Sequence, residues 1–329
     1  MRLTRRALLA GGAAALVPLP AFARDARYPP PDREAMLPVP GGRVYVRVNG
    51  DLNGPRPPLV LIHGGPGGTH TGMLDALALA DERAVILYDQ LDSGRSDWRQ
   101  DPANWRVPRF VDELEAIRRG LHVPRWHVCG MSWGGTIALE YAARRPAELI
   151  SVVLGGPLIA TRAWLADADV LRAALPPATR DTLLACESAT SPPPAACDAA
   201  TDDFYRHYNR REEAPAAMRD AMRAPGNRGS NQRLYETMWG RSEFVATGTL
   251  RDYDGTPLLA KLDGARTLFM VGQYDEARPV TALGFAARVP GGAEVAVIPG
   301  AAHGTLSDRP AETIGILRAW LARHDTPSL

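Results

Sequence analysis

The sequence predicts an α/β fold in which a mostly parallel sheet is covered by helices on both faces and carries an inserted helical cap. Several short apolar runs show no polar alternation, as expected of strands that are buried on both faces. Amphipathic helical stretches separate these runs in the order of repeated strand–helix units. A third observation is that residues 161–254 are rich in Ala, Arg and Pro and have few β-branched runs. We expect this stretch to be the cap, and residues 24–160 and 255–329 to form the core.

The expected elements follow one another along the core. Residues 28–40 are interpreted as a Pro-rich lead, and the alternating segment 43–48 is typical of a half-buried strand at which the core begins. The other expected strands are residues 58–63, 84–88, 127–129, 150–154, 267–271 and 294–298. The expected helices are residues 110–121, 136–145, 163–175, 214–223, 280–288 and 312–324.

The N-terminus has the three parts of an export signal. A basic start containing Arg5 and Arg6 precedes a short apolar, Gly-rich run, and small residues around Ala23 provide a cleavage site. The arginine pair indicates the twin-arginine type. We expect residues 1–23 to be removed and the protein to be exported, to the periplasm or beyond. The apolar run is shorter than a membrane span of about 20 residues, so no membrane attachment is expected after removal.

Composition and cysteine placement limit the partners. The 38 Lys and Arg residues nearly balance the 37 Asp and Glu residues, and no block of like charges occurs, so nucleic acid is not an expected partner. Export leads to an oxidising compartment, where Cys186 and Cys197 are close enough in sequence to form a predicted disulfide across a Pro/Ala-rich loop. Cys129 lies in an apolar run and is expected to be a buried, unpaired thiol. No His and Cys residues have metal-ligand spacing, and neither a metal nor a cofactor is expected.

Residues 130–134, Gly-Met-Ser-Trp-Gly, match the G-x-S-x-G nucleophile elbow. The motif lies between an apolar strand and a helix, which is where a sharp turn exposes the hydroxyl of Ser132. Side chains at positions 130 and 134 would collide with neighbouring backbone, which explains both glycines. An ordinary glycine-rich turn is the alternative in a chain with 31 Gly, but the strand–helix context favours a nucleophile.

A serine nucleophile needs a histidine base, and on this scaffold the order along the chain is Ser, acid, His. Three histidines follow the elbow: His207 in the expected cap, His324 near the C-terminus, and His303 in a Gly/Ala loop after an expected strand. The position of His303 makes it the predicted base.

Asp275 is the predicted acid because it directly follows the expected strand 267–271. Asp263 precedes that strand and lies on the wrong side of it. Asp308 is the competitor, but it follows the histidine in sequence and is expected to cap the helix after Pro310.

An anionic tetrahedral intermediate needs two backbone donors. The N–H of Trp133, which follows the nucleophile, is the first expected donor. The loop 63–68, His-Gly-Gly-Pro-Gly-Gly, is expected to supply the second from Gly65. His63 is expected to brace this loop.

These motifs together resemble the proline iminopeptidases of the α/β-hydrolase fold, a group that includes tricorn-interacting aminopeptidases and bacterial L-amino-acid amidases. The resemblance spans about residues 40–325 and is carried by residues 63–67, 88–90, 94–97, 131–135, 242–254 and 272–276. It implies an acyl-enzyme mechanism on short peptides or amino-acid amides. Asp92 stands where the family usually has glycine, so the local loop shape is expected to differ.

The resemblance also implies how a substrate would be held. In that family two glutamates bind the free α-amino group, and the matching positions are Glu243 and Glu276. Carboxylates can hold an ammonium group by charge-assisted hydrogen bonds. Tyr235 is expected to line the same pocket. The implied activity is release of an N-terminal proline or small apolar residue; the alternative is a carboxylesterase or lactonase, in which the glutamates have no ammonium group to bind.

Overall fold

The computed structural model describes residues 27–187 and 192–325. One eight-stranded sheet has the order β1-β2-β4-β3-β5-β6-β7-β8. Pairs from β4 to β8 are parallel, whereas β1–β2 and β2–β4 are antiparallel, which confirms the mostly parallel sheet predicted from the sequence. The strands are β1 (Arg33–Val39), β2 (Gly42–Asn49), β3 (Leu59–Ile62), β4 (Val85–Tyr88), β5 (Trp126–Met131), β6 (Leu149–Gly155), β7 (Thr267–Gly272) and β8 (Glu294–Ile298).

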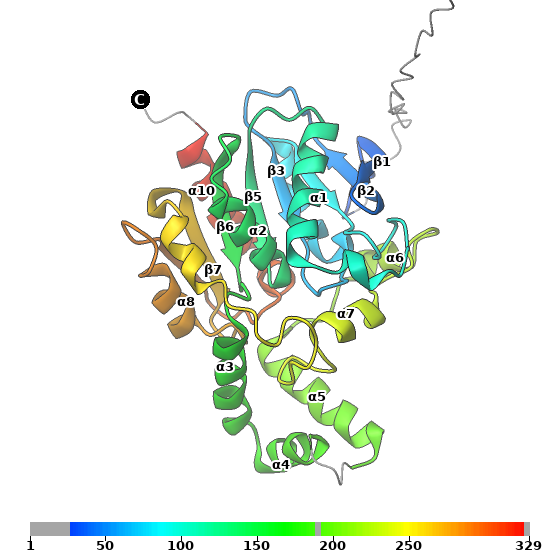
Figure 1. Cartoon of the computed structure of the whole chain (residues 1–329), viewed down its shortest axis with the longest axis vertical. Helices are drawn as coiled ribbons and strands as arrows, with labels where there is room; N and C mark the ends of the chain where they lie inside the picture. The colour runs from blue at the N-terminus through cyan, green and yellow to red at the C-terminus, as the bar shows by residue number, and fades with distance from the viewer. Residues whose placement is uncertain (1–26, 188–191, 326–329) are drawn as a thin grey trace, which may run out of the picture.

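Helices cover both faces of the sheet (Figure 1). One face packs against α1 (Val107–Gly120), α2 (Trp133–Ala143) and α8 (Pro279–Ala286), and the other against η1 (His70–Asp81) and α10 (Pro310–His324). The remaining helices are α3 (Thr161–Ala173), α4 (Pro177–Cys186), α5 (Pro194–Tyr208), α6 (Ala216–Met222), α7 (Gln232–Met238), α9 (Thr305–Asp308), η2 (Pro102–Asn104), η3 (Thr256–Lys261) and η4 (Gly264–Arg266).

The central strands are continuous apolar runs because both of their faces are buried. Every residue of β3, β4, β5 and β7 is buried. Alternate residues of β3 enter the two apolar clusters on opposite sides of the sheet, Val60 on the α2 side and Leu61 on the α10 side. Parallel central strands bring their carboxyl ends to one edge of the sheet, where the loops that follow β3, β5, β7 and β8 meet.

The interpretation of residues 28–40 as a lead without a strand is wrong. Arg33–Val39 forms the edge strand β1, paired with β2 through a hairpin whose turn places Gly41 at φ +92°. Pro38 obscured this strand, but an edge strand tolerates proline because one side of it makes no hydrogen bonds within the sheet.

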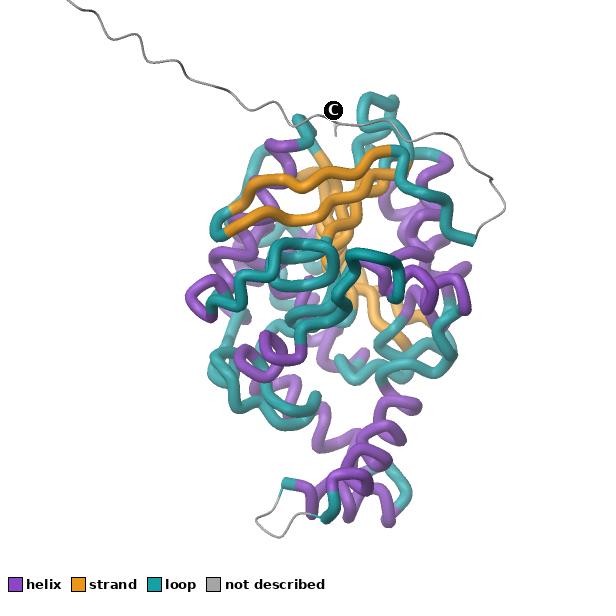
Figure 2. Tube along the Cα trace, turned by 90° about the vertical axis from the view of Figure 1, so that its right-hand side faces the viewer, coloured by secondary structure: helices purple, strands orange, loops and turns teal. Residues whose placement is uncertain are grey.

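Helices α3 to α7 are inserted between β6 and β7 and form the cap. Figures 1 and 2 show α3, α4 and α5 projecting from the strand-containing body. They enclose a small apolar core of their own, which includes Leu183, Phe204 and Phe244. The cap therefore covers the carboxyl edge of the sheet without extending it.

Cys186 and Cys197 are joined in a disulfide, with 5.8 Å between their Cα atoms. Cys186 ends α4 and Cys197 lies in α5, so the bond ties two cap helices together. Pro177 and Pro194 occupy the first helical positions of α4 and α5, which tolerate proline, so helix ends at Cys186 and begins again at Pro194 on either side of the expected loop. Cys129 is buried and free, and burial raises the pKa of its thiol to about 12.

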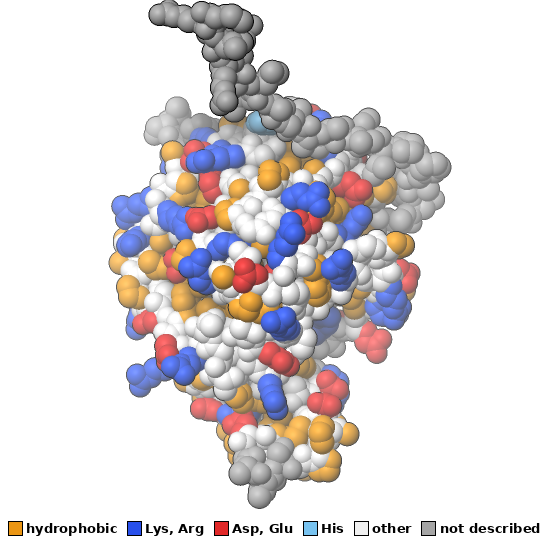
Figure 3. All heavy atoms as spheres, turned by 45° about the vertical axis from the view of Figure 1, so that its right-hand side comes forward, with side chains coloured by type: hydrophobic (Ala, Val, Ile, Leu, Met, Phe, Trp, Pro, Cys, Tyr) orange, Lys and Arg blue, Asp and Glu red, His pale blue; other side chains and the backbone are white. Residues whose placement is uncertain are grey.

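The surface carries mixed charge. Acidic and basic side chains are interspersed over the face shown in Figure 3. Within residues 27–187 and 192–325 no helix is both long and apolar enough to cross a membrane. The predicted export signal, residues 1–23, lies outside the described residues.

Candidate active site

Ser132 lies in the sharp turn between β5 and α2, with φ 57° and ψ −123°. A Cβ atom on Gly130 would approach the carbonyl oxygen of Gly134 to 2.0 Å, and one on Gly134 would approach that of Ile62 to 2.1 Å. The backbone therefore requires glycine at both positions, as the motif predicts. A positive φ at a non-glycine residue is unfavourable, and here it holds the hydroxyl at the carboxyl edge of the sheet.

Asp275 and His303 meet on the loops that follow β7 and β8. The imidazole Nδ1 lies 2.7 Å from Oδ1 of Asp275, which is almost fully buried. This carboxylate also accepts the backbone N–H groups of Gly272 and Ala277. An acceptor fixed in this way keeps the proton on Nδ1 and leaves Nε2 free to bind another proton.

The imidazole lies beside the elbow. Gly155 accepts the N–H of Ser132 at 2.7 Å, and a Cβ atom on the next residue, Gly156, would approach Nδ1 of His303 to 2.7 Å. Ser132, His303 and Glu243 line one cavity of about 250 Å³. The serine hydroxyl makes no hydrogen bond with any residue that the structure describes, a state common in active sites without substrate.

Two backbone N–H groups belong to residues near Ser132: Trp133 follows it in the chain, and Gly65 lines the same cavity. Trp133 is the first residue of α2, and Gly65 has φ +119° in the loop after β3. Neither N–H has an acceptor in the described parts of the chain. A Cβ atom on the adjacent Gly64 would lie 3.5 Å from Oγ of Ser132, so this loop contacts the elbow directly. The two unpaired donors are the ones predicted to hold an oxyanion.

A buried network braces the glycine loop against the elbow. The backbone N–H of Gln90 donates to Nε2 of His63 at 3.0 Å, and its side-chain amide donates to the carbonyl oxygen of His63 at 2.9 Å. The indole N–H of Trp133 donates to Oε1 of Gln90 at 3.0 Å. Burial lowers the pKa of His63 to about 4, so this histidine is neutral and structural.

Asp92 retains the left-handed backbone that glycine would adopt, with φ 67°. Its carboxylate accepts the backbone N–H of Gln100 at 2.7 Å and the indole N–H of Trp105 at 2.8 Å. These two bonds stabilise a conformation that aspartate tolerates better than most residues. The loop is thus anchored by the side chain that replaces the family's glycine.

Glu243 and Glu276 both lie beside His303. Oε1 of Glu276 is 3.8 Å from Nε2 of His303 and accepts the amide of Asn209 at 2.5 Å. Oε2 of Glu276 is buried and has no hydrogen-bond partner among the described residues. Oε1 of Glu243 accepts the hydroxyl of Tyr235 at 2.6 Å, which places Tyr235 beside the site.

Charge is concentrated around the imidazole. Burial raises the pKa of Glu243, and burial together with the charge of Glu243 raises the pKa of Glu276 well above its ordinary value, whereas a positive charge on His303 opposes both shifts and favours the ionised carboxylates. Burial alone would lower the pKa of His303, but the carboxylates of Asp275, Glu276 and Glu243 outweigh it and raise the pKa to about 9. A site that holds these carboxylates together is prepared for a cation.

The residues that were alternatives for the catalytic acid or base make other contacts. Asp308 does not cap the helix after Pro310; its Oδ1 accepts the N–H groups of Arg211 and Glu212, and its Oδ2 accepts that of Ala302. Asp308 therefore ties the cap to the loop that carries His303, a contact between distant segments that local spacing does not reveal. His207 lies on α5 and His324 on α10, both bonded to carbonyl oxygens of their own helices.

Three neighbours of the site were not predicted. Trp164 of α3 packs edge-to-face on His303, with 5.6 Å between ring centroids, and donates to the carbonyl oxygen of Glu243 at 3.0 Å. Asn209 contacts Glu276, and Arg210 lines the cavity. All three come from the first half of the cap, where the sequence shows no motif; the position of Asn209 as C-cap of α5 is the one local signal.

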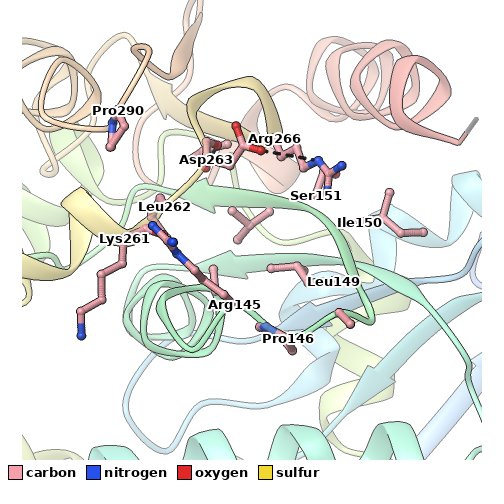
Figure 4. Close-up of a pocket in the computed structure, with 14 residues that line it drawn as sticks. Arg145, Pro146, Leu149, Ile150, Ser151, Lys261, Leu262, Asp263, Arg266 and Pro290 are labelled. Atoms are coloured by element: carbon pink, nitrogen blue, oxygen red, sulfur yellow. Dashed lines mark hydrogen bonds and ion pairs between the residues drawn. The ribbon is translucent and has the colours of Figure 1, made fainter. Parts of the chain in front are cut away.

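A separate cavity of about 510 Å³ lies at the opposite edge of the sheet (Figure 4). Its lining includes the starts of β6 and β7, with Arg266 paired to Asp263. The described residues contain no group of three or more His, Cys, Asp or Glu side chains that could hold a metal ion. The serine, histidine and carboxylates described above thus lie at the other end of the sheet from this cavity.

The sheet, the elbow and the later aspartate and histidine define the class of α/β hydrolases, and residues 57–310 match the model of the alpha/beta hydrolase fold family. Two relatives are 34% identical: the proline iminopeptidases of Heyndrickxia coagulans, over 88% of this chain and 98% of that protein, and of Levilactobacillus brevis, over 89% and 97%. The crystal structure of a Mycobacterium smegmatis proline iminopeptidase is 33% identical and superimposes with a TM-score of 0.79, covering 89% of this chain and 98% of that one. The chain belongs to the proline iminopeptidase family.

Proposed function

We propose that this protein is a serine aminopeptidase that releases an N-terminal residue, proline or a small apolar residue, from short peptides or amino-acid amides. The observation that carries the proposal is the pair of carboxylates, Glu243 and Glu276, beside the imidazole that lines the same cavity as the elbow serine. An enzyme that cleaves after the first residue must hold an ammonium group a short, fixed distance from the carbonyl it attacks. Buried carboxylates meet this demand through charge-assisted hydrogen bonds.

The chemistry follows from the positions of the three catalytic side chains. His303 takes the proton of Ser132 at Nε2 while Ser132 attacks the carbonyl carbon, and Asp275 stabilises the imidazolium that forms. The N–H groups of Trp133 and Gly65 hold the oxyanion. His303 then protonates the leaving amine, and water, deprotonated by the same imidazole, releases the acyl group from Ser132.

Substrate selection follows from the charges. The ammonium group of a free N-terminus relieves the mutual repulsion of Glu243 and Glu276. An acetylated N-terminus brings no positive charge to these buried carboxylates and cannot relieve this repulsion, which is unfavourable in a buried site. Tyr235 holds the Glu243 carboxylate in place through its hydroxyl.

A comparison of blocked and free substrates tests this proposal. Proline 4-nitroanilide and alanine 4-nitroanilide are compared with their N-acetyl forms, and 4-nitrophenyl acetate reports simple esterase activity. An aminopeptidase hydrolyses the free forms and loses the blocked ones by about 100-fold or more in kcat/KM, as expected when charged hydrogen bonds are lost. Equal rates on free and blocked forms, or a strong preference for the simple ester, would establish the esterase alternative.

We also propose that the mature protein acts outside the cytoplasm. The Cys186–Cys197 disulfide supports this, because such bonds persist in oxidising compartments. The arginine pair near the N-terminus supports a twin-arginine route. Replacing Arg5 and Arg6 by lysine should keep the activity in the cytoplasmic fraction, whereas unchanged distribution between fractions would refute this route.

A further inference from the structure

Glu276 lies near Nε2 of His303, the imidazole nitrogen that must accept the proton of Ser132. Its Oε1 lies 3.8 Å from Nε2 of His303, whereas the hydroxyl of Ser132 makes no hydrogen bond with the described residues. Because Nδ1 is taken by Asp275, Nε2 is the nitrogen that must be unprotonated for catalysis. Without substrate a carboxylate therefore lies 3.8 Å from this nitrogen and favours a proton on it.

We propose that the substrate's own ammonium group activates the base. Without substrate, the carboxylate of Glu276 keeps His303 protonated as an imidazolium. A bound ammonium group replaces the imidazolium as the positive partner of Glu276, so that Nε2 of His303 loses its proton and can act as the base. This inference rests on the proposed function and adds a role for Glu276 beyond binding. One proton passes from His303 to solvent on binding, and no covalent bond other than that N–H bond changes. The ligand enters with one positive charge and the imidazole loses one, so the charge of the site is conserved.

The surroundings of Glu276 allow this exchange. Oε2 of its carboxylate is buried without a hydrogen-bond partner among the described residues, and Asn209 alone donates to Oε1. A buried carboxylate oxygen without a donor is unfavourable unless a ligand satisfies it. An ammonium group has several N–H donors and can bond this free oxygen, which the planar imidazolium does not reach at hydrogen-bond distance.

The other charged groups around His303 also raise or lower the pKa of its imidazole. Asp275 on the β7 loop and Glu243 from the cap favour the imidazolium, as Glu276 does. Arg210 lines the cavity beside Gly304 and opposes it, and His63 is neutral because burial lowers its pKa to about 4. The three carboxylates raise the pKa of His303 to about 9, so at neutral pH the base is mostly protonated without substrate.

The variant Glu276→Gln tests the switch, because it keeps the shape and an acceptor for Asn209 but removes the charge. With 4-nitrophenyl acetate, which has no amino group, wild-type kcat/KM should rise with pH toward a midpoint near 9. In Glu276→Gln the midpoint should fall by about one pH unit or more, so ester hydrolysis at pH 7 becomes about tenfold faster. The same variant should lose activity on proline 4-nitroanilide, and these opposite effects cannot come from a structural defect.

Two further variants serve as controls. Glu243→Gln should shift the ester midpoint in the same direction, since Glu243 also favours the imidazolium, but less, because Glu276 contributes more to the raised pKa. Glu212→Gln, on an exposed carboxylate paired with Arg309, should leave the midpoint unchanged. An unchanged midpoint in Glu276→Gln would overturn the switch, whatever Glu243→Gln shows and even if wild-type enzyme prefers free amines. A wild-type enzyme indifferent to free amines would refute the proposed function itself.

Proton release gives a readout that does not depend on turnover. Prolinamide is titrated into Ser132→Ala at pH 7.5 by calorimetry in two buffers of different ionisation enthalpy. Close to one proton should be released per ligand bound, and clearly fewer in Ser132→Ala/Glu276→Gln. Binding without proton release in Ser132→Ala would overturn the switch.

Discussion

The sheet carries a serine, a histidine and an aspartate in mutual proximity at each of its two edges, and the two sets differ in almost every other respect. At the carboxyl edge are Ser132, His303 and Asp275. At the opposite edge Nδ1 of His127 lies 2.8 Å from Oγ of Ser151, and Nε2 lies 3.3 Å from Oδ1 of Asp325.

The set at the opposite edge is fully bonded. The hydroxyl of Ser151 also accepts the indole N–H of Trp320 at 3.0 Å, and Arg83 donates to both oxygens of Asp325, at 2.7 and 2.9 Å. Ser151 borders the cavity of Figure 4, but it is only 1% exposed, and His127 is completely buried. This set joins β5 and β6 to the end of α10 and has the properties of a structural clamp.

The set at the carboxyl edge is incompletely bonded. Ser132 is held in a strained turn, its hydroxyl has no partner among the described residues, and the two N–H groups beside it are also unpaired. Unsatisfied donors and strain are unfavourable for folding but suit a site that completes its bonds with a substrate. A Ser–His–Asp arrangement thus indicates catalysis only where some of its hydrogen-bonding groups are left unpaired and can bind a ligand.

The largest expected effect separates the two serines. Ser132→Ala should reduce kcat on proline 4-nitroanilide by a factor on the order of 10⁶, because no other nucleophile is available. Ser151→Ala should leave kcat unchanged and lower the free energy of unfolding by about 1–3 kcal/mol, since Trp320 and His127 lose a partner. Steady-state kinetics and urea unfolding of both variants measure kcat and the free energy of unfolding. Appreciable activity in Ser132→Ala would show that Ser132 is not the nucleophile.

The two aspartates, Asp275 and Asp325, should differ in the same way as the two serines. Asp275→Asn should lower kcat by about 10⁴-fold, because the amide no longer fixes the Nδ1–H tautomer. Asp325→Asn should leave kcat unchanged and cost about 1–3 kcal/mol of stability, since buried Arg83 loses the nearer of its two ionic partners and keeps only Glu82. A comparable loss of kcat in both variants, measured with the same substrate, would mean that the two sets are coupled.

The smallest expected effect is a pH dependence of stability from the clamp. Burial lowers the pKa of His127, although the hydrogen bond to Asp325 opposes the shift. The unfolded chain therefore takes up a proton at this residue near pH 6.5 before the folded protein does, so stability falls as pH decreases below about 6.5. His127→Gln should make this decline shallower in urea unfolding followed from pH 7 to pH 5; an unchanged slope would show that His127 is not buried as a neutral group.

The sequence predicts the catalytic edge better than the clamp for a physical reason. An elbow needs glycine at fixed offsets from Ser132, and strands buried on both faces need continuous apolar runs, so both leave local patterns. The clamp joins His127 to a residue 198 positions away, and no local pattern encodes such a contact. The same limit hid Asn209 and Trp164, which reach the site from the cap.

Strand β1 and Asp92 illustrate two other limits. Pro38 made β1 hard to predict, because this strand depends on its pairing with β2 and the intrinsic strand propensity of the residues does not reveal that pairing. At Asp92, bonds from Gln100 and Trp105 stabilise a backbone that the family's glycine would adopt freely. In both cases tertiary contacts decided a conformation that local sequence left open.

Covalent labelling distinguishes the reactive serine from the structural one. The mature protein is treated with diisopropyl fluorophosphate, with and without prolinamide, and the modified residue is identified by peptide mass spectrometry. The structure predicts one label, on Ser132, that prolinamide prevents and that abolishes activity, with Ser151 unmodified. A label on Ser151, or full inactivation with Ser132 unmodified, would contradict the assignment of the carboxyl edge as the active site.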